Sequence, residues 1–151
     1  MDILNLGAGN RIVDGAVNHD IVAHRPEITV VYDLNDLPWP WEDESFDLIE
    51  AWSVLEHLRQ TLYVSLDECW RLLRPDGKLH IKLPLWNNEA SWIDPSHYWK
   101  FSLRSLDHFD PDTKRGHDYA FYPFHKWQII EEATFIMGTG SFAATMRPRK
   151  S

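Results

Sequence analysis

The sequence predicts an α/β domain built on a mostly parallel sheet, and three stretches of the chain carry this prediction. The first apolar run stops at Gly7-Ala8-Gly9, the pattern of a buried parallel strand that enters a glycine turn. A second apolar run ends at Asp20. Apolar residues at helical spacing over 54–73 then precede a strand pattern at 78–83. Strands that alternate with helical segments are typical of α/β folds.

The length and composition fit one soluble domain, 1–151. A chain of 151 residues is long enough to bury a single core. No apolar run approaches a membrane span and no secretory signal is recognisable, so we expect no membrane contact. The lone cysteine, Cys69, excludes an internal disulfide and fits a cytoplasmic location. The net charge of −8 argues against nucleic acid as a partner.

The first three strands are expected at 2–6, 16–22 and 28–32. Their connections, 10–15 and 23–27, are too short for a full crossover, which needs roughly 10–12 residues or more. We therefore expect a minimal sheet whose first crossover helices are absent or reduced to one turn. One face of this half-sheet would then be bare. Either tryptophan-rich segments or a second subunit would cover it, and the second case makes the protein a homo-oligomer.

The middle of the chain combines a loop, a strand and the longest helical pattern. The segment 34–45 is a proline-containing loop, and 46–51 reads as the fourth strand. The helix expected over 54–73 should end at Pro75-Asp76-Gly77, after which 78–83 forms the fifth strand.

The last part of the chain combines an irregular segment with a hairpin. Residues 85–126 lack clear periodicity apart from a short helix at 102–109, with Ser102 as its N-cap. Long irregular segments are commonly lids or binding loops, so 85–126 is expected to be a lid or acceptor-site insertion. The apolar patterns at 127–136 and 141–147 flank a Gly-Thr-Gly turn and predict an antiparallel hairpin.

The glycine turn and Asp20 together predict a nucleoside site. Ligands of open α/β sheets bind outside the carboxyl ends of the strands, and glycine lets a ligand approach the backbone. A carboxylate such as that of Asp20 can accept hydrogen bonds from ribose hydroxyls. A nicotinamide dinucleotide fits less well. Ile12 stands at the third glycine position of that fingerprint, and there is hardly room for the helix that would bind the pyrophosphate.

Four segments in order resemble a known family: ILNLGAGN, VNHDIV, LPWPWEDESFDLIEAWSVLEHL and LLRPDGKLHIKLP. The chain is similar to class I S-adenosylmethionine-dependent methyltransferases, closest to the small-molecule-type subgroup with LEHL and LRPDG signatures. The resemblance implies a Rossmann-like, mostly parallel seven-stranded sheet with an antiparallel C-terminal hairpin. It also implies S-adenosyl-L-methionine as the cofactor and methyl transfer to a small-molecule acceptor, with O-methylation expected. Motifs of nucleic-acid methyltransferases are missing, which again argues against nucleic acid.

The resemblance also assigns cofactor-binding residues, which follow the first four strands: Gly7, Ala8, Gly9, Asn10, Asp20, Ile21, Asp33, Leu34, Trp52 and Ser53. Asp20 would accept from both ribose hydroxyls. Asp33 would take the exocyclic amino group of adenine, unless it caps a turn with Asn35 instead. Trp52 and Ser53 would flank the methionine end.

Catalysis by such an enzyme depends on alignment, and a base is needed only where the acceptor must lose a proton. The candidate catalytic residues are His57, Asp94 and His97. Some members of the family bind a divalent metal around the position of Glu56 and His57. Ser53 stands where a further ligand is expected, so Glu56, His57 and His97 would form only a partial site. We therefore assign no metal ligands.

Two alternatives remain open from the sequence. The chain could be a non-catalytic cofactor-binding or assembly module that kept the pocket and lost the acceptor site. It could also be a transferase that uses a different nucleoside on the same sheet. Turnover separates the first alternative from an enzyme, and nucleotide preference separates the second.

Overall fold

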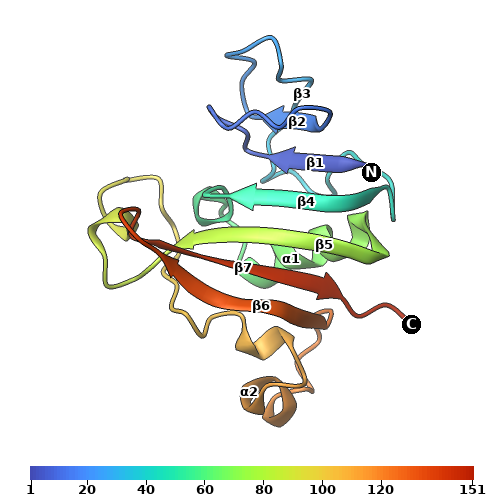
Figure 1. Ribbon diagram of the computed structural model, residues 1–151, viewed down its shortest axis with the longest axis vertical. Coiled ribbons are helices and arrows are strands. Elements are labelled where there is room, and N and C mark those ends of the chain that lie inside the picture. Colours follow the sequence, from blue (N-terminus) through green and yellow to red (C-terminus); the bar gives the residue numbers. More distant parts are fainter.

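One seven-stranded sheet, in the order β3-β2-β1-β4-β5-β7-β6, runs through the computed structural model, which describes residues 1–151 (Figure 1). Its strands are β1 (Ile3–Leu6), β2 (Val17–Asp20), β3 (Val30–Val31), β4 (Phe46–Trp52), β5 (Leu73–Pro84), β6 (Trp127–Ile136) and β7 (Ser141–Pro148). The first five strands are mutually parallel, while β7 is antiparallel to both β5 and β6. The expected Rossmann-like sheet with an antiparallel C-terminal hairpin is confirmed.

Helices are few. They are α1 (Leu62–Leu72), α2 (Lys114–Asp118) and three short 3-10 turns, η1 (Leu55–His57), η2 (Glu89–Ser91) and η3 (Asp107–Phe109). No helix precedes η1, so the first crossover helices are absent, as the short connections predicted. The longest helix, α1, has 11 residues, and none of the helices has the length and apolar character needed to span a bilayer.

The helix expected over 54–73 is shorter than predicted, and this is a correction. The chain forms η1, turns extended at Leu58 and begins α1 only at Leu62. The carbonyl oxygens of Glu56 and Leu58 accept hydrogen bonds from the Tyr98 N–H (2.9 Å) and the Trp99 indole (2.8 Å). Because the later loop occupies these acceptors, they are not used to continue a helix.

The strand after α1 also begins earlier than expected, at Leu73 rather than at residue 78. Leu73 is fully buried and pairs with Phe46 of β4. The Pro75-Asp76-Gly77 segment therefore lies inside β5 and does not form a separate turn. An irregular register between Phe46 and Leu48 accommodates it.

The helix expected over 102–109 is also wrong in extent, because only η3 forms there. Ser102 accepts from the Arg104 N–H in a turn and caps no helix. The short helix α2 was not expected, since Gly116 lies in its middle and glycine disfavours helices. Gly116 is required there by packing, because an added Cβ would lie 1.9 Å from the carbonyl oxygen of Asp110.

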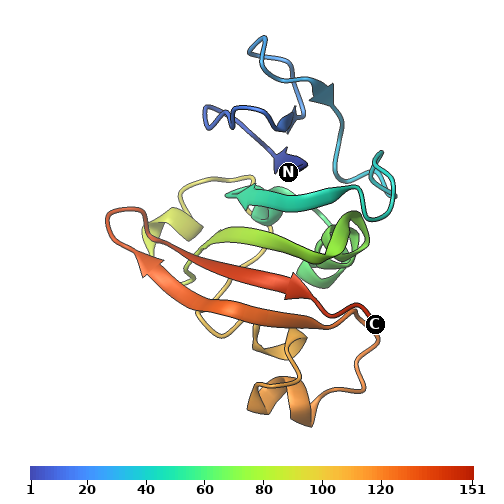
Figure 2. The ribbon, with the colours of Figure 1, turned by 45° about the vertical axis from the view of Figure 1, so that its right-hand side comes forward.

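The two faces of the sheet differ in character. On one face, side chains in register across four strands are completely buried: Leu4, Ile49, Leu79 and Met146. They join the core, to which α1 contributes Leu66, Cys69 and Leu72. Figures 1 and 2 show α1 behind the sheet and no helix in front of it.

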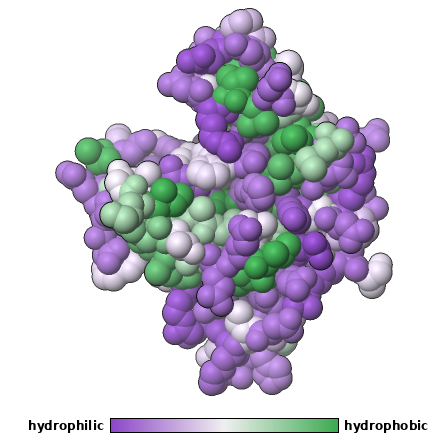
Figure 3. Space-filling model, viewed as in Figure 1, coloured by the Kyte–Doolittle hydropathy of each residue, from purple (hydrophilic) through white to green (hydrophobic).

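The open face carries a polar row in register across six strands: Asn18, Asn5, Glu50, His80, Thr145 and Glu131. Neighbours in this row bind one another, as Asn5 donates to Asn18 at 2.8 Å and Thr145 donates to Glu131 at 2.6 Å. In Figure 3 this side of the molecule shows hydrophilic residues between smaller hydrophobic patches. The open face therefore needs no cover to keep a large apolar surface from water. A second subunit over it stays a prediction.

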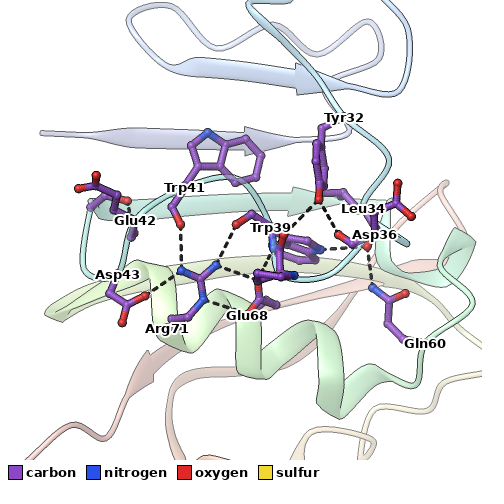
Figure 4. A network of polar contacts seen from close by, with 12 residues as sticks. Tyr32, Leu34, Asp36, Trp39, Trp41, Glu42, Asp43, Gln60, Glu68 and Arg71 are labelled. Atoms are coloured by element: carbon purple, nitrogen blue, oxygen red, sulfur yellow. Dashed lines mark hydrogen bonds and ion pairs between the residues drawn. The ribbon is translucent and has the colours of Figure 1, made fainter.

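Arg71 of α1 fastens the loop 34–45 to the core (Figure 4). Its guanidinium donates to the carbonyl oxygens of Trp39 (3.1 Å) and Trp41 (2.9 Å) and pairs with Glu68 at 2.8 Å. The indole of Trp39 is buried and donates to the carbonyl of Leu34 at 2.9 Å. These contacts hold the chain just after β3, where the candidate site begins.

Candidate functional site

A cavity of about 400 Å³ lies where the carboxyl ends of β1 to β4 meet. Its lining residues are Gly7, His19, Asp20, Ile21, Tyr32, Asp33, Leu34, Asn35, Ser53, Val54, His57, Leu58 and Ser96. Three hollows are larger: about 520 Å³ beside β6, about 570 Å³ on the open face and about 500 Å³ beside Met1 and Asp47. None of these includes the glycine turn or Asp20, so the smaller cavity is the candidate site.

The glycine turn after β1 requires glycine at its first position. Gly7 has φ +56°, and an added Cβ would lie 2.5 Å from Cγ2 of Val54. The turn is tied to β2, because the Ala8 N–H donates to the His19 carbonyl at 2.8 Å. The backbone therefore approaches the cavity more closely than any residue with a Cβ would permit.

Asp20 ends β2 at the edge of the cavity. Its Oδ2 accepts from the Gly9 N–H at 2.8 Å and its Oδ1 from the Ile21 N–H at 2.7 Å. Each carboxylate oxygen has a further acceptor site. The side chain is thus oriented by backbone donors and can still accept from a ligand's hydroxyl groups.

Asp33 follows β3 and caps a turn with Asn35. From the sequence alone, this turn is the alternative to a contact between Asp33 and adenine. Its Oδ1 accepts from the backbone N–H (2.9 Å) and the side-chain amide (3.0 Å) of Asn35. The backbone hydrogen bond is the main cause that lowers the pKa of Asp33. The other oxygen, Oδ2, has no such bond, so the turn and a ligand contact are compatible.

His19 lines the cavity and was missed by the sequence reasoning. Its Nδ1 accepts from the Gly7 N–H (3.2 Å), while its Nε2 contacts the carbonyl of Tyr32 at 2.9 Å. A backbone N–H can only donate and a carbonyl can only accept, so the ring is neutral with its proton on Nε2. Burial is the main cause that lowers the pKa of His19. A histidine one position before a strand end carries no pattern that distinguishes it.

Six of the ten predicted cofactor-binding residues line the cavity: Gly7, Asp20, Ile21, Asp33, Leu34 and Ser53. Ser53 has φ +56°, an uncommon conformation for a residue with a side chain and one that clusters at functional sites. Ala8 is buried, and Gly9 contacts the site through Asp20.

Trp52 and Asn10 lie outside the cavity, contrary to expectation. Because β4 extends through Trp52, strand alternation places this side chain on the open face with Glu50, to which its indole donates. The guanidinium of Arg11 lies 4.4 Å from the Trp52 ring centroid. Asn10 is exposed and accepts from the guanidinium of Arg25 at 3.0 Å.

Of the three candidate catalytic residues, His57 lines the cavity, and a serine connects it to Asp94. The Ser96 hydroxyl donates to Asp94 Oδ1 at 2.6 Å and lies 2.7 Å from Nδ1 of His57. Since the hydroxyl proton goes to Asp94, His57 donates from Nδ1 and its Nε2 lone pair is free. Burial, and then the neighbouring His97, hold the pKa of His57 below its ordinary value. Ser96 itself was missed by the sequence reasoning.

His97 packs against His57, with ring centroids 4.7 Å apart. Its Nδ1 lies 3.1 Å from the carbonyl oxygen of Ser91, which can only accept, so this nitrogen carries the proton. Its Nε2 is 3.9 Å from Asp94 Oδ2. The three candidate residues thus form one cluster beside the cavity.

Glu56 lies next to this cluster with a completely buried side chain. Neither carboxylate oxygen has a hydrogen-bond partner, and Oε1 is 3.8 Å from Nε2 of His57. Burial raises the pKa of Glu56 to about 8. Ligand atoms of Glu56, His57 and His97 all lie within 4.8 Å of one another. One carboxylate with two imidazoles is a donor set that divalent transition metals bind, so these residues fit such an ion.

Only part of the segment 85–126 lies at the cavity. Ser96 lines it, and the adjoining Tyr98 and Trp99 bind η1 through the hydrogen bonds described above. The helix α2 lies near β6, at the opposite end of the sheet from β3 (Figure 1). A lid role for the whole segment stays a prediction.

The comparisons with known proteins point to one group. The sequence model of a methyltransferase-domain family matches residues 13–81, a little under half of the chain. No curated protein sequence matches.

Three solved structures share the fold at low sequence identity. A SAM dependent methyltransferase from Archaeoglobus fulgidus has a TM-score of 0.61 at 13% identity, with 97% of this chain and 85% of that chain covered. Burkholderia thailandensis 1,6-didemethyltoxoflavin-N1-methyltransferase, solved with 1,6-didemethyltoxoflavin and S-adenosylhomocysteine, has a TM-score of 0.61 at 16% identity. The match covers 99% of this chain and 71% of that chain. A chain from the complex between the Haloferax volcanii Trm112 methyltransferase activator and the putative methyltransferase has a TM-score of 0.62 at 14% identity. The match covers 99% of this chain and 83% of that chain.

Proposed function

This chain has the fold and the domain sequence of class I S-adenosylmethionine-dependent methyltransferases, and from this premise we propose that it is an active enzyme that methylates small molecules. S-adenosylmethionine is the cofactor that the domain match and the solved neighbours support. The acceptor group we propose is a hydroxyl, which makes the reaction an O-methylation.

The observation that carries this proposal is the cavity at the strand ends. It combines a glycine turn, a strand-end carboxylate and an aspartate turn within about 400 Å³. Asp20 would bind the ribose hydroxyls, Asp33 and Leu34 would contact the adenine, and Ser53 would lie near the methionine end. Pockets for small ligands typically have volumes of about 300–1,000 Å³, which includes this cavity.

The acceptor side of the proposal rests on the cluster of His57, Ser96 and Asp94. Asp94 and Ser96 hold the His57 ring so that its Nε2 lone pair is free. A neutral imidazole can take the proton of a hydroxyl near neutral pH. Alignment of the acceptor oxygen, the methyl group and the sulfur would supply most of the rate. His97 packs against His57 and would limit its movement.

A small acceptor is favoured over nucleic acid by charge. The net charge of −8 opposes binding to a phosphate backbone. The Burkholderia neighbour was solved with a small heterocycle, 1,6-didemethyltoxoflavin, beside S-adenosylhomocysteine, which is consistent with a small acceptor on this fold.

Turnover tests the proposal. The protein is incubated with S-adenosylmethionine labelled in its methyl group and with pools of phenols, catechols and hydroxy acids. We expect S-adenosylhomocysteine to form with at least one pool. We also expect Asp94→Ala to lower the rate by no more than the roughly 10²–10⁴ that a general base contributes, because it removes the carboxylate that orients His57 through Ser96. The matched control is Asp67→Ala, which removes a carboxylate that contacts His125 on the surface away from the cavity.

Binding of S-adenosylhomocysteine without turnover of any pool would contradict the enzyme proposal. That outcome would favour the non-catalytic cofactor-binding or assembly module. Binding of a different nucleotide in its place would favour another nucleoside-using transferase.

A further inference from the structure

We propose that Glu56, His57 and His97 bind one divalent transition-metal ion, and that Asp94, Ser96 and the Ser91 carbonyl orient the two imidazoles for it. The inference concerns metal binding alone and does not depend on methyl transfer. Three features carry it: a buried carboxylate without a partner, two imidazole nitrogens with free lone pairs, and hydrogen bonds that set both rings.

The carboxylate of Glu56 is the first feature. Its side chain is 0% exposed, and neither oxygen takes part in a hydrogen bond. Its one ion-pair contact within 4 Å is His57 Nε2 at 3.8 Å. Besides burial, the Lys82 ammonium lowers the pKa of Glu56 and the Asp94 carboxylate raises it, but neither forms an ion pair with it. Buried carboxylates are normally paired with a cation or coordinate a metal. A cation at this point would supply the missing partner.

The two histidines are the second feature. His57 donates from Nδ1 to the Ser96 hydroxyl (2.7 Å), and His97 donates from Nδ1 to the Ser91 carbonyl (3.1 Å). Both rings therefore carry their proton on Nδ1 and have a lone pair on Nε2. One ligand atom from each histidine and one from Glu56 lie within 4.8 Å of one another. A single ion can be reached by all three with small movements of the side chains.

The outer hydrogen bonds are the third feature. Histidines that bind a metal almost always donate their other ring N–H to a carboxylate, carbonyl or similar acceptor. Here Ser96 accepts from His57 and in turn donates to Asp94 at 2.6 Å. The Ser91 carbonyl that accepts from His97 also accepts from Lys100 at 2.8 Å, which holds it in place. Both rings are thus oriented as metal ligands are.

The donor set predicts which ions bind. Imidazole nitrogen suits zinc, cobalt, nickel and copper, whereas magnesium and calcium prefer sites made of oxygen alone. Ser53 provides no carboxylate, so the chain supplies three ligands and leaves a coordination position open. One carboxylate and two histidines with an open position are also the ligands of catalytic zinc sites. Since His57 and Ser96 line the cofactor cavity, the ion would lie beside it.

Metal binding and the base role of His57 exclude each other. A lone pair that coordinates an ion cannot accept a proton, so His57 and His97 are ligands whenever the ion is present. A bound divalent ion supplies Lewis acidity and lowers the pKa of a hydroxyl that coordinates it. The chain's own contribution is then to position the ion beside the cavity.

Titration with cobalt(II) tests the inference, using full-length, tag-free protein stripped of metal. We expect one cobalt per chain, visible absorption bands typical of nitrogen and oxygen ligands, and a higher unfolding temperature with cobalt or zinc. Magnesium at the same concentration should give no such shift. Glu56→Gln and His97→Ala should lose the bands. Ser96→Ala should weaken binding by roughly 10–100-fold, as the loss of an outer hydrogen bond typically does.

Two controls keep the result interpretable. His125→Ala removes another histidine that lies beside a carboxylate, Asp67, and should bind cobalt as the wild type does. Glu56→Gln without metal should be folded, because it replaces an unpaired buried carboxyl with an amide of the same shape.

Absence of cobalt binding at millimolar concentration would overturn the inference. Unchanged binding in both Glu56→Gln and His97→Ala would overturn it as well, since surface histidines would then be responsible. Calorimetry with S-adenosylhomocysteine on the same samples reports the cofactor cavity separately, so failure of either proposal can be recognised by itself.

Discussion

The backbone N–H of Gly9 donates to Oδ2 of Asp20 over 2.8 Å, and this bond joins the turn after β1 to the end of β2. Together with the bond from the Gly7 N–H to His19 Nδ1, it fixes the two strand ends as one unit. The geometry of the cavity therefore depends on contacts between neighbouring strands, and substitutions in these contacts should alter stability and cofactor binding together.

Gly7→Ala should destabilise the protein by about 2–5 kcal/mol. The left-handed backbone at φ +56° costs about 1–2 kcal/mol for a residue with a Cβ. Overlap with Val54, only 2.5 Å from the added atom, adds about 1–3 kcal/mol. Urea unfolding measures the change.

Gly15→Ala is the matched control for this substitution. Gly15 has φ +74°, but no atom lies within 4 Å of an added Cβ. It should therefore cost only the backbone strain, about 1–2 kcal/mol. Adding Val54→Ala removes the Cγ2 contact but leaves the Cβ of residue 54 at 2.8 Å, so it should relieve part of the overlap in Gly7→Ala and none in Gly15→Ala. Equal losses in the two alanine variants would show that the contact with Val54 does not matter.

His19 should make stability depend on pH below neutrality. Burial lowers its pKa from the ordinary value of 6.5, so near pH 6 the unfolded chain binds more protons than the folded one. Its contribution is fully present above about pH 6.5 and is lost as the pH falls through the folded pKa. Protonation would also remove the acceptor of the Gly7 N–H.

The comparison that isolates this effect is between the wild type and His19→Gln. Glutamine can donate and accept but does not titrate. We expect the free energy of unfolding to fall more steeply in the wild type than in the variant between about pH 7 and pH 5. Parallel curves would assign the acid sensitivity to other groups.

Arg71→Met should destabilise the protein by about 2–4 kcal/mol, because it leaves two tryptophan carbonyls without this donor and leaves Glu68 with only the Trp39 N–H as a donor. Arg71→Lys should have a free energy of unfolding between those of the wild type and Arg71→Met, since one ammonium cannot replace all the hydrogen bonds of the planar guanidinium. Arg104→Met is the control. Its side chain is 72% exposed, and its ion pair with Asp107 should contribute no more than about 1 kcal/mol. Similar losses in the two methionine variants would contradict a structural role for Arg71.

The strands were predictable because their signals are local. The apolar run before Gly7, the carboxylate at Asp20 and the Gly-Thr-Gly turn after 127–136 each specify a strand end or a hairpin without reference to the rest of the chain. Six predicted cofactor residues reach the cavity for the same reason, since they directly follow strands.

Features that depend on distant contacts could not be predicted. The break between η1 and α1 arises because Tyr98 and Trp99, forty residues away or more, occupy the carbonyls of Glu56 and Leu58. Ser96 reaches His57 by the same approach of the loop. Neither contact has a periodic or compositional signal.

The orientation of Trp52 has a similar explanation. It depends on how far β4 extends, and one further residue of strand places the indole on the open face beside Glu50 instead of in the cavity.

Calorimetric titration with S-adenosylhomocysteine, on the wild type, Asp20→Ala and the control Asp36→Ala, tests the central claim most directly. Asp36 is an exposed carboxylate that does not line the cavity. Micromolar affinity in the wild type corresponds to about −8 kcal/mol. Loss of the Asp20 carboxylate should weaken binding by roughly 1.5–3 kcal/mol, while Asp36→Ala should leave it unchanged. No heat with the wild type at millimolar ligand, or equal affinities in all three proteins, would contradict the cofactor site described here.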